Sequence, residues 1–363
     1  METVEIDGSH GEGGGQILRT SLALSIITGK PLVMTKIRAG RAKPGLRRQH
    51  LTCVEAAAAM CGAELRGATV GSQHLTFTPR EATTETELAF DIGTAGSTTL
   101  VVQTILIPAI IAGKKLHFTV AGGTHNPMAP PFDFLDRVFA PCLRAMGARV
   151  ELELDGYGFV TGAPSGSKPR DKRDFYDAPT ANRGRIAVSI EPGELAPIAL
   201  DTAHAITSRH AVAIVAGLPT HVATRELEIV RERLGFAHSE CEVRELSGGP
   251  ANLLMIEIER GAPPARPIRE LITVHGEKGL RAETVAARAC DEVATHLAMA
   301  VPVGEHLADQ LLLPFAIAGG RFRCAPLSLH ATTNIDTIRK FIDVSFGVLA
   351  DGASVIVEVG AKR

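Results

Sequence analysis

The 363-residue sequence contains no tryptophan, and its aromatic residues make up only 4% of the chain. A groove for a long single-stranded nucleic acid uses aromatic side chains as stacking platforms, so this scarcity argues against such a groove. The formal net charge is only −2, which excludes a general positive field that would coat a long nucleic acid. Any contact with nucleic acid must therefore come from a local patch.

The six cysteines form neither a Cys-x-x-Cys pair nor the spacing of a zinc site, which predicts free thiols in a reducing compartment. The apolar run over 100–112 is too short for a membrane span, which needs about 18 residues, and is interrupted by Gln103 and Pro108. The N-terminus shows no basic segment followed by an apolar one, so no signal peptide is expected. These absences predict a soluble cytoplasmic protein without a membrane partner.

A pattern of helix, glycine, strand, loop and helix occurs three times along the chain. Its copies open with predicted glycine-flanked helices at 11–31, 93–115 and 304–320. Predicted strands follow at 33–40, 116–123 and 322–330, and predicted second helices at 46–65, 132–152 and 334–348. The shared order predicts an α/β (α+β) fold of three repeated βαβαββ modules with their helices packed inward.

Between the second and third copies the composition changes. Residues 162–185 are rich in glycine, proline, serine and charge, which predicts an exposed loop. Predicted strands and helices beyond this loop form an α/β segment of their own. We therefore expect a large domain of residues 1–198 and 298–363, interrupted by a smaller inserted α/β domain at 199–297.

Residues 11–19, GEGGGQILR, place three consecutive glycines before a predicted helix. Backbone N–H groups can approach an anion closely in such a segment, and the helix dipole favours negative charge there. The segment matches neither a P-loop nor a dinucleotide fingerprint, and a tight turn without chemical role explains it equally well. Glu12 would be an odd neighbour for a phosphate unless it holds a metal ion.

A basic cluster occupies residues 35–50. Its cations are Lys36, Arg38, Arg41, Lys43, Arg47 and Arg48, with no acidic residue among them. Arginine binds phosphate through paired N–H groups, and the rest of the chain is slightly acidic. Two or three of these side chains would simply be solvated. The local excess of positive charge nevertheless predicts a binding site for an RNA phosphate.

His330 follows a predicted apolar strand, at the entry to a helix rich in threonine and asparagine. A lone histidine is usually structural. This one, however, occupies the same place in the third copy as the basic loop in the first and loop 126–131 in the second. If the modules pack around a pseudo-threefold axis, these loops converge, and a neutral imidazole can attack an activated phosphorus near pH 7.

The chain resembles the RNA 3′-terminal phosphate cyclases over nearly its whole length. The resemblance rests on eight blocks in the right order: DGSHGEGGGQILR (7–19), IRAGRAKPGLRRQH (37–50), IGTAGSTTLVVQT (92–104), GGTHNPMAPPFDF (122–134), GLPTHVATREL (217–227), GEKG (276–279), GEHLADQLLLP (304–314) and SLHATTNI (328–335). It implies three modules like the C-terminal domain of a translation initiation factor, plus a smaller inserted domain, in agreement with the repeat.

The resemblance also implies roles for single residues. His330 would be the nucleophile that takes AMP from ATP. The adenylate pocket would consist of Gln103, Pro131, His306, Leu307, Ala308, Asp309 and Gln310, with Pro131 on one face of the adenine. The residues expected to contact phosphates are Arg19, Arg38, Arg41 and Gln49, and Glu12 would hold Mg²⁺ or Mn²⁺.

The implied activity is an ATP-dependent, ligase-type nucleotidyl transfer to RNA 3′-phosphate ends. His330 takes AMP from ATP and expels pyrophosphate, AMP moves to the RNA 3′-phosphate, and the vicinal 2′-OH closes a 2′,3′-cyclic phosphate with release of AMP. The protein would mainly position the groups and stabilise their charge. The oligomeric state stays open, a homodimer included.

Two departures from the family pattern stand out. His306 occupies a position where the family often has tyrosine, which changes the expected stacking partner of adenine. Residues 158–167, GFVTGAPSGS, stand where the family has GFYP-x-GGG, which alters the surface expected near RNA.

Two other functions are compatible with this architecture. A non-catalytic relative that serves in ribosome assembly is expected to lack the nucleophilic histidine, whereas His330 and its ATTNI context are present. An enolpyruvyl transferase would share the repeats, but nothing beyond the fold matches that chemistry.

Overall fold

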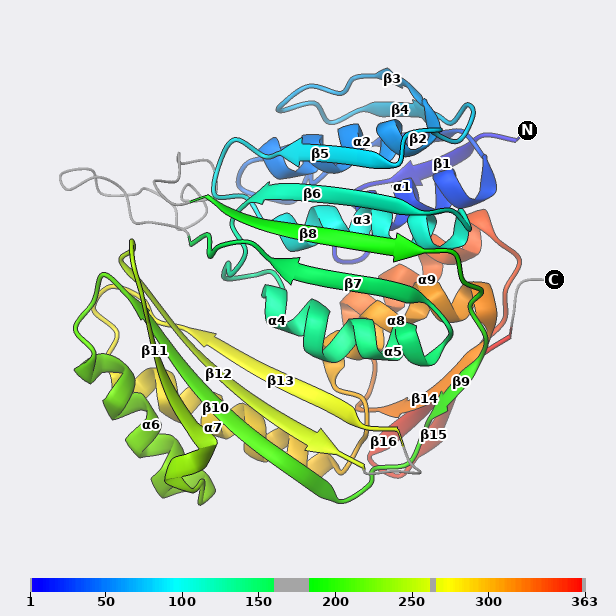
Figure 1. Cartoon of the computed structure of the whole chain (residues 1–363). Coiled ribbons are helices and arrows are strands. Elements are labelled where there is room, and N and C mark those ends of the chain that lie inside the picture. Colours follow the sequence, from blue (N-terminus) through cyan, green and yellow to red (C-terminus); the bar gives the residue numbers. More distant parts are fainter. Residues whose placement is uncertain (1, 160–182, 262–265, 361–363) are drawn as a thin grey trace.

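The computed structural model describes residues 2–159, 183–261 and 266–360, and their elements are arranged as in Figure 1. Four sheets of four strands each are combined with helices, and the predicted α/β class is confirmed. In the described ranges no helix is both long and apolar enough to cross a membrane.

The first sheet belongs to a unit that runs from the N-terminus to residue 78. Its elements are β1 (Val4–Asp7), α1 (Gly15–Thr28), β2 (Leu32–Thr35), α2 (Arg48–Cys61), β3 (Glu64–Arg66) and β4 (Leu75–Thr78). The strand order is β1-β2-β4-β3, with β1 and β2 parallel and the other pairs antiparallel.

The second sheet repeats this order. Its elements are β5 (Glu87–Asp91), α3 (Thr98–Ile111), β6 (Leu116–Gly122), α4 (Phe132–Phe134), the π-helical turn η1 (Leu135–Phe139), α5 (Ala140–Ala145), β7 (Arg149–Leu154) and β8 (Gly184–Glu191). The strands lie in the order β5-β6-β8-β7, and the first pair is again parallel.

The third sheet has the same order but draws on distant parts of the chain. Its elements are β9 (Ile198–Leu200), α8 (Glu305–Ala318), β14 (Gly320–Cys324), α9 (Leu329–Phe341), β15 (Phe346–Asp351) and β16 (Ser354–Val359). Strand β9 is parallel to β14, and the order is β9-β14-β16-β15. In the sequence, a further segment of strands and helices, residues 206–299, separates β9 from α8.

Residues 206–299, called the insert below, form the fourth sheet. Their elements are β10 (Ile206–Ala216), α6 (His221–Leu234), the 3₁₀ turn η3 (His238–Glu240), β11 (Cys241–Leu246), β12 (Ala251–Arg260), β13 (Ile268–His275) and α7 (Ala282–Met299). The strand order is β11-β10-β12-β13, and α6 and α7 cover the face that points away from the other sheets (Figure 1). The predicted domain bounds 199–297 stay a prediction.

Strand β10 explains how the insert is attached. Ala211, Ala213 and Val215 pack under α6 and α7, while the alternate residues Val212 and Ile214 join the main core. Because successive side chains of a strand point to opposite faces, both faces of this strand are buried.

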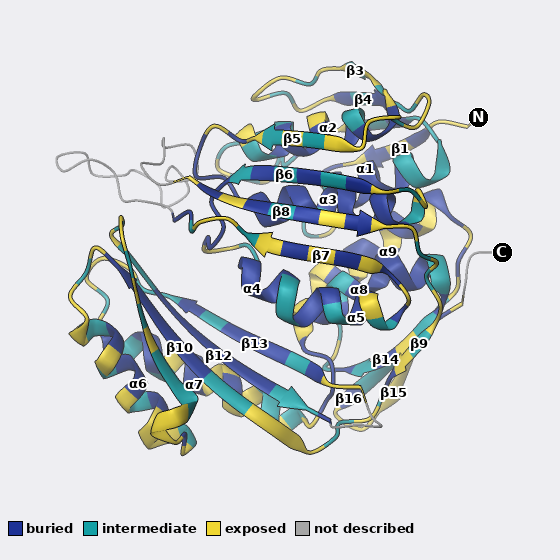
Figure 2. Ribbon diagram, viewed as in Figure 1, coloured by how far each residue is buried: buried dark blue, intermediate teal, exposed yellow. Residues whose placement is uncertain are grey.

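The main core lies between the helices of the three units. Helices α1, α2, α3, α8 and α9 form a connected set of helix–helix contacts, and Figure 2 colours many of their residues as buried. Helix α3 is buried on nearly all sides because its sequence is apolar all round.

Several predicted elements end earlier than expected. The helix predicted at 46–65 ends at Cys61, because Gly62 takes a left-handed conformation with φ 56°, and the one predicted at 132–152 gives way to β7 at Arg149. The strand predicted at 322–330 ends at Cys324, so His330 lies in a helix and not at a strand end. The loop predicted at 162–185 lies mostly outside the described residues, and Gly184 already begins β8.

Candidate functional site

His330 is the second residue of α9. The N-cap residue of this helix is Ser328, whose hydroxyl accepts a hydrogen bond of 3.3 Å from the backbone N–H of Ala331. The glycine-rich loop of the first unit packs on the same turn, since the backbone N–H of Glu12 donates to Thr333 Oγ1 at 3.2 Å. The His330 side chain is 53% exposed and therefore open to a reactant.

A hydrogen bond to Gln16 of α1 orients the His330 ring. His330 Nδ1 lies 2.7 Å from Gln16 Oε1, and Gln16 Nε2 donates to both carboxylate oxygens of Asp309 at 2.6 Å. An ionised carboxylate only accepts hydrogen bonds, so the Gln16 amide must turn its nitrogen to Asp309 and its oxygen to His330. The neutral ring then carries its proton on Nδ1 and leaves a lone pair on Nε2.

Further contacts hold Asp309, which lies on α8. Asn334 Nδ2 donates to Asp309 Oδ1 at 3.0 Å, and Thr20 Oγ1 donates to Asn334 Oδ1 at 2.8 Å. Burial raises the pKa of Asp309, while the amide donors of Gln16 and Asn334 act against this shift. Side chains of α1, α8 and α9 thus form one partly buried chain of hydrogen bonds behind His330, called the relay below.

Glu12 and Arg41 lie on the other side of the His330 ring. They form an ion pair, and Glu12 Oε1 is 3.9 Å from His330 Nε2. Glu12 Oε2 is buried and makes no hydrogen bond to the described residues. This free oxygen fits a Mg²⁺ or Mn²⁺ ion that takes its other ligands from phosphates and water. No group of three or more His, Cys, Asp or Glu side chains in the described ranges could hold an ion alone.

The residues expected at phosphates differ in their surroundings. Arg38 donates through Nη1 to the carbonyl oxygens of Lys43 and Gly45, at 3.0 and 2.8 Å, and so shapes the basic loop itself. Gln49 Oε1 accepts from the backbone N–H of Ser97 at 3.0 Å, which ties α2 to the start of α3. Arg19 is partly buried in α1, where burial lowers its pKa and Asp309 counteracts the shift.

His50 is a site residue that the sequence analysis missed. Its ring is only 5% exposed, and Nδ1 accepts a hydrogen bond of 3.2 Å from the backbone N–H of Arg47. Burial, followed by the charges of Arg38 and Arg19, lowers its pKa well below the ordinary value. A side chain on Gly15 would overlap Nε2, so this N–H faces the start of α1. Its only signal in the sequence was its position at the third residue of α2, where a side chain can cap the helix.

The predicted adenylate residues fall into separate groups. Gln103 Nε2 donates to Gln310 Oε1 at 2.7 Å, which joins α3 and α8. Leu307 and Ala308 are buried in the main core, so only their backbone could face a nucleotide. His306 is exposed and interacts electrostatically with Glu292 on α7 of the insert. The structure links Asp309 to His330 through Gln16.

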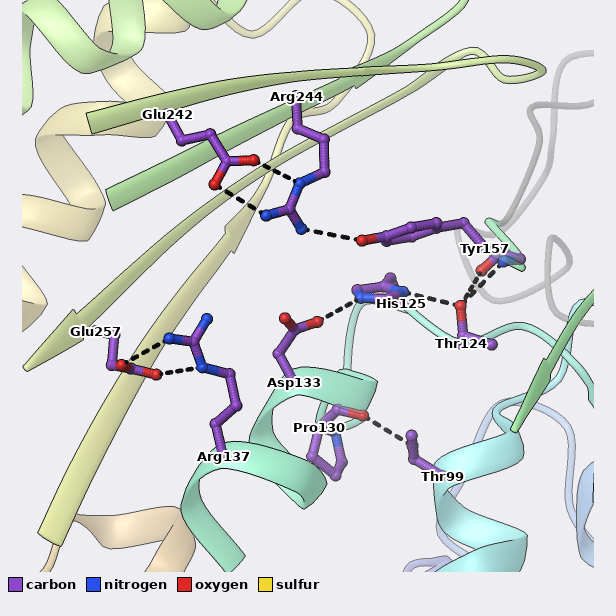
Figure 3. A network of polar contacts seen from close by, with 11 residues as sticks. Thr99, Thr124, His125, Pro130, Asp133, Arg137, Tyr157, Glu242, Arg244 and Glu257 are labelled. Carbon is purple, nitrogen blue, oxygen red and sulfur yellow. Dashed lines mark hydrogen bonds and ion pairs between the residues drawn. The ribbon is translucent and has the colours of Figure 1, made fainter. Parts of the chain in front are cut away.

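The loop that carries Pro131 is fixed by a network at the insert (Figure 3). The carbonyl of Pro130 accepts a hydrogen bond of 2.8 Å from Thr99 Oγ1. Buried His125 lies 2.8 Å from both Thr124 Oγ1 and Asp133 Oδ2. Burial works to raise the pKa of Asp133, but the contact with His125 outweighs it and holds this pKa below its usual value.

Two arginines join this network to the insert. Arg137 of η1 forms an ion pair with Glu257 of β12, with Nε 2.8 Å from Oε2. Arg244 of β11 binds Glu242 and donates to the Tyr157 hydroxyl at 3.0 Å (Figure 3). The Tyr157 ring stacks on His125, with 4.9 Å between the ring centres.

The model of a known family, RNA 3′-terminal phosphate cyclase, matches residues 10–348. The chain belongs to this family. It is 44% identical to the RNA 3′-terminal phosphate cyclase of Koribacter versatilis (strain Ellin345), over 96% of this chain and 92% of the relative. It is 43% identical to the RNA 3′-terminal phosphate cyclase of Ectopseudomonas mendocina (strain ymp), over 94% and 93%. The predicted membership of the cyclase family is confirmed.

One solved structure, the enolpyruvyl transferase NikO from Streptomyces tendae, aligns with 98% of this chain and 48% of its own chain. The sequence identity is 10% and the TM-score 0.37, values from which no conclusion about this cyclase-family chain follows.

Proposed function

We propose that this protein converts the 3′-terminal phosphate of RNA into a 2′,3′-cyclic phosphate, with ATP as the source of a histidine-bound AMP. The observation that carries the proposal is the 2.7 Å contact between His330 Nδ1 and Gln16 Oε1. It supports a nucleophile because it leaves the lone pair on Nε2 of a half-exposed side chain. Membership of the cyclase family supports the same reaction.

In the proposed first step, His330 Nε2 attacks the α-phosphorus of ATP. A P–N bond forms, and the P–O bond to pyrophosphate breaks. The imidazole gains positive charge, which the Gln16 carbonyl oxygen stabilises at Nδ1–H, with Asp309 holding the Gln16 amide from behind. The cations of Arg41 and Arg19 lie where they can balance the negative charge of the phosphates.

A divalent ion fits this proposal at Glu12, whose Oε2 has no hydrogen-bond partner among the described residues. When bound, Mg²⁺ or Mn²⁺ would neutralise charge on the departing pyrophosphate. Arg41 pairs with the other oxygen of the same carboxylate and would keep Glu12 oriented.

In the second step, an oxygen of the RNA 3′-phosphate attacks the AMP phosphorus and the P–N bond breaks, so that the RNA end becomes adenylated. In the third, the 2′-OH attacks the 3′-phosphorus, loses its proton, and expels AMP. We assign the holding of the RNA phosphate to the basic loop, chiefly to Arg41 beside His330.

The proposal is tested by incubating the protein with ATP labelled at the α-phosphate and measuring label bound covalently to the chain. We expect an adduct that is labile in acid and stable in alkali, as a P–N bond is, and no adduct in His330→Ala. A circular dichroism melt of the variant controls for its fold. Label that persists in His330→Ala, or that behaves as a tyrosine ester, would contradict the assignment of His330 as the residue that receives AMP.

A second experiment separates the three steps. RNA that ends in a 2′-deoxy-3′-phosphate lacks only the group that closes the ring. We expect it to accumulate as the adenylated strand without cyclic product. If it is never adenylated, the 2′-OH is required earlier than proposed, and if it is joined to a second strand, the protein is a ligase of strands instead.

A further inference from the structure

The insert leads directly into the helix that carries Asp309. Helix α7 ends at Met299, and α8 begins at Glu305 after a short buried connection through Val301 and Val303. The position of the first turn of α8 therefore depends on how the insert is fixed to the main core.

A carboxylate of the insert lies at this first turn. Glu270 is the third residue of β13, is only 8% exposed, and faces Gly304, the N-cap residue of α8. A side chain on Gly304 would overlap the carboxylate, so glycine is what allows the close approach. Burial raises the pKa of Glu270 to about 7, whereas the backbone N–H of Gly304 lowers it.

Helix α8 has no side chain of its own for this task. In a capping box, the side chain of the third helical residue accepts a hydrogen bond from the backbone N–H of the N-cap residue. In α8 that residue is Leu307, which is apolar and fully buried. Glu270 supplies the carboxylate from another part of the chain, where it also opposes the positive end of the helix dipole.

Stability alone does not account for this arrangement. Glu270 Oε2 makes no hydrogen bond to the described residues, and the neighbouring charge of Glu305 raises the pKa of Glu270 further. Burying a carboxylate without a cation is costly. The helix that it touches places Asp309 against Gln16 and Asn334, one turn after the N-terminus.

We propose that Glu270 is a positioning residue through which the insert fixes the start of α8 and, through Asp309 and Gln16, the orientation of the His330 ring. This inference rests on the proposed function, because it concerns the rate at which His330 receives AMP. It gives the insert a part in the first chemical step without contact between the insert and the reacting atoms.

The test compares Glu270→Ala with Glu226→Ala in the full-length protein. Glu226 is a matched control, because it is also a buried glutamate of the insert whose pKa burial raises to about 7, but it lies on α6, on the opposite side of the sheet. Single-turnover formation of the AMP adduct is measured at saturating labelled ATP, together with the melting temperature and hydrogen exchange of the peptide over residues 304–310.

Both substitutions are expected to lower the melting temperature. Only Glu270→Ala should slow adduct formation, by about tenfold, and raise hydrogen exchange at 304–310. Glu270→Gln keeps a polar side chain of the same size facing Gly304 and should stay within about threefold of the wild type. Gly304→Ala displaces the carboxylate with Glu270 intact and should reproduce the slow rate, even if Glu270→Ala fails to fold.

Adduct formation at the wild-type rate in Glu270→Ala and Gly304→Ala would overturn the inference, as would an equal loss in Glu226→Ala. A wild type that forms no adduct at all contradicts the proposed function instead. In that case, hydrogen exchange at 304–310 alone decides whether Glu270 holds the start of α8.

Discussion

His330 and His50 lie at the starts of two helices, α9 and α2, and present the same ring nitrogen, Nε2, in opposite protonation states. His330 donates a hydrogen bond from its Nδ1–H to Gln16 Oε1 and keeps a lone pair on Nε2. His50 accepts a hydrogen bond at Nδ1 from Arg47, so its proton is on Nε2, which faces the start of α1. One ring thus offers a lone pair at Nε2, as the proposed attack requires, and the other offers an N–H donor.

The difference comes from what lies behind each ring. A glutamine whose amide is fixed by a carboxylate accepts from His330, whereas a helix-terminal N–H donates to His50. The pKa of His50 is further lowered by burial and by four arginines, the strongest effects after burial coming from Arg38 and Arg19. The tautomer of each histidine is thus set by the group that contacts its Nδ1.

The largest expected effect comes from removing the partner of His330. Gln16→Ala leaves Nδ1 without its acceptor, so the ring can rotate and change tautomer. We expect adduct formation to slow by about 100-fold, the scale of losing an orienting partner, with the ATP concentration for half-maximal rate nearly unchanged. Single-turnover assays with labelled ATP measure both quantities.

Thr20→Val is the graded control for this prediction. It removes the outermost donor of the relay, the hydroxyl that donates to Asn334, and should slow the reaction by about threefold. An effect of Thr20→Val as large as that of Gln16→Ala would mean that the relay acts through the fold and not through the ring.

A smaller effect is expected on the arginine side of the comparison. Arg41→Ala removes the cation beside Glu12 and should weaken AMP transfer from a preformed adduct to an RNA 3′-phosphate by about tenfold. Added salt should slow transfer by the wild type more than by the variant, because one phosphate contact is already lost.

Lys36 provides the control for that experiment, because it belongs to the same basic loop but pairs with Asp7 on the exposed surface. Lys36→Ala should transfer AMP at nearly the wild-type rate. If it is as slow as Arg41→Ala, the loop contributes general positive charge and not a specific contact.

The smallest effect concerns the charge state of His50. Its pKa is lower in the folded than in the unfolded chain, so the unfolded chain binds the proton first as the pH falls through about 6.5. The wild type should therefore lose stability on acidification, and His50→Gln, which cannot be protonated, should lose less. We expect the gap in melting temperature to change by roughly 2 °C between pH 8 and pH 5.5. A gap that is independent of pH would show that folding leaves the pKa of His50 unchanged.

The order of the elements was largely predictable from the sequence, because the glycine at the end of each first helix and the apolar periodicity recur. The helical position of His330 could not be predicted in this way. The apolar residues 322–329 predict a strand up to this histidine, but Ser328, two residues before it, already caps a helix. A cap competes with strand pairing through a single hydroxyl, which periodicity does not register.

The resemblance brought His330, Glu12 and Arg41 together, and the structure places all three within one site. Its assignment of Asp309 to the adenylate pocket stays a prediction, and the structure adds hydrogen bonds of Asp309 with Gln16 and Asn334. The partnership of Gln16 and Asp309 joins residues from opposite ends of the chain, and a single sequence contains no signal for such a pair. The role of Glu270 was hidden for the same reason.

Strand β9 pairs with β14 across the whole length of the insert, with Ile198 opposite Gly320. In the first two units, the first and second strands are separated by little more than one helix, so their contacts are local in sequence. Distant contacts form slowly, because the chain must lose more freedom before they close. We therefore expect the first two units to fold early, already during synthesis, while the third waits until the insert has closed upon itself. His330, the proposed nucleophile, belongs to that last unit, so the protein should acquire its reactivity only when the entire chain is assembled.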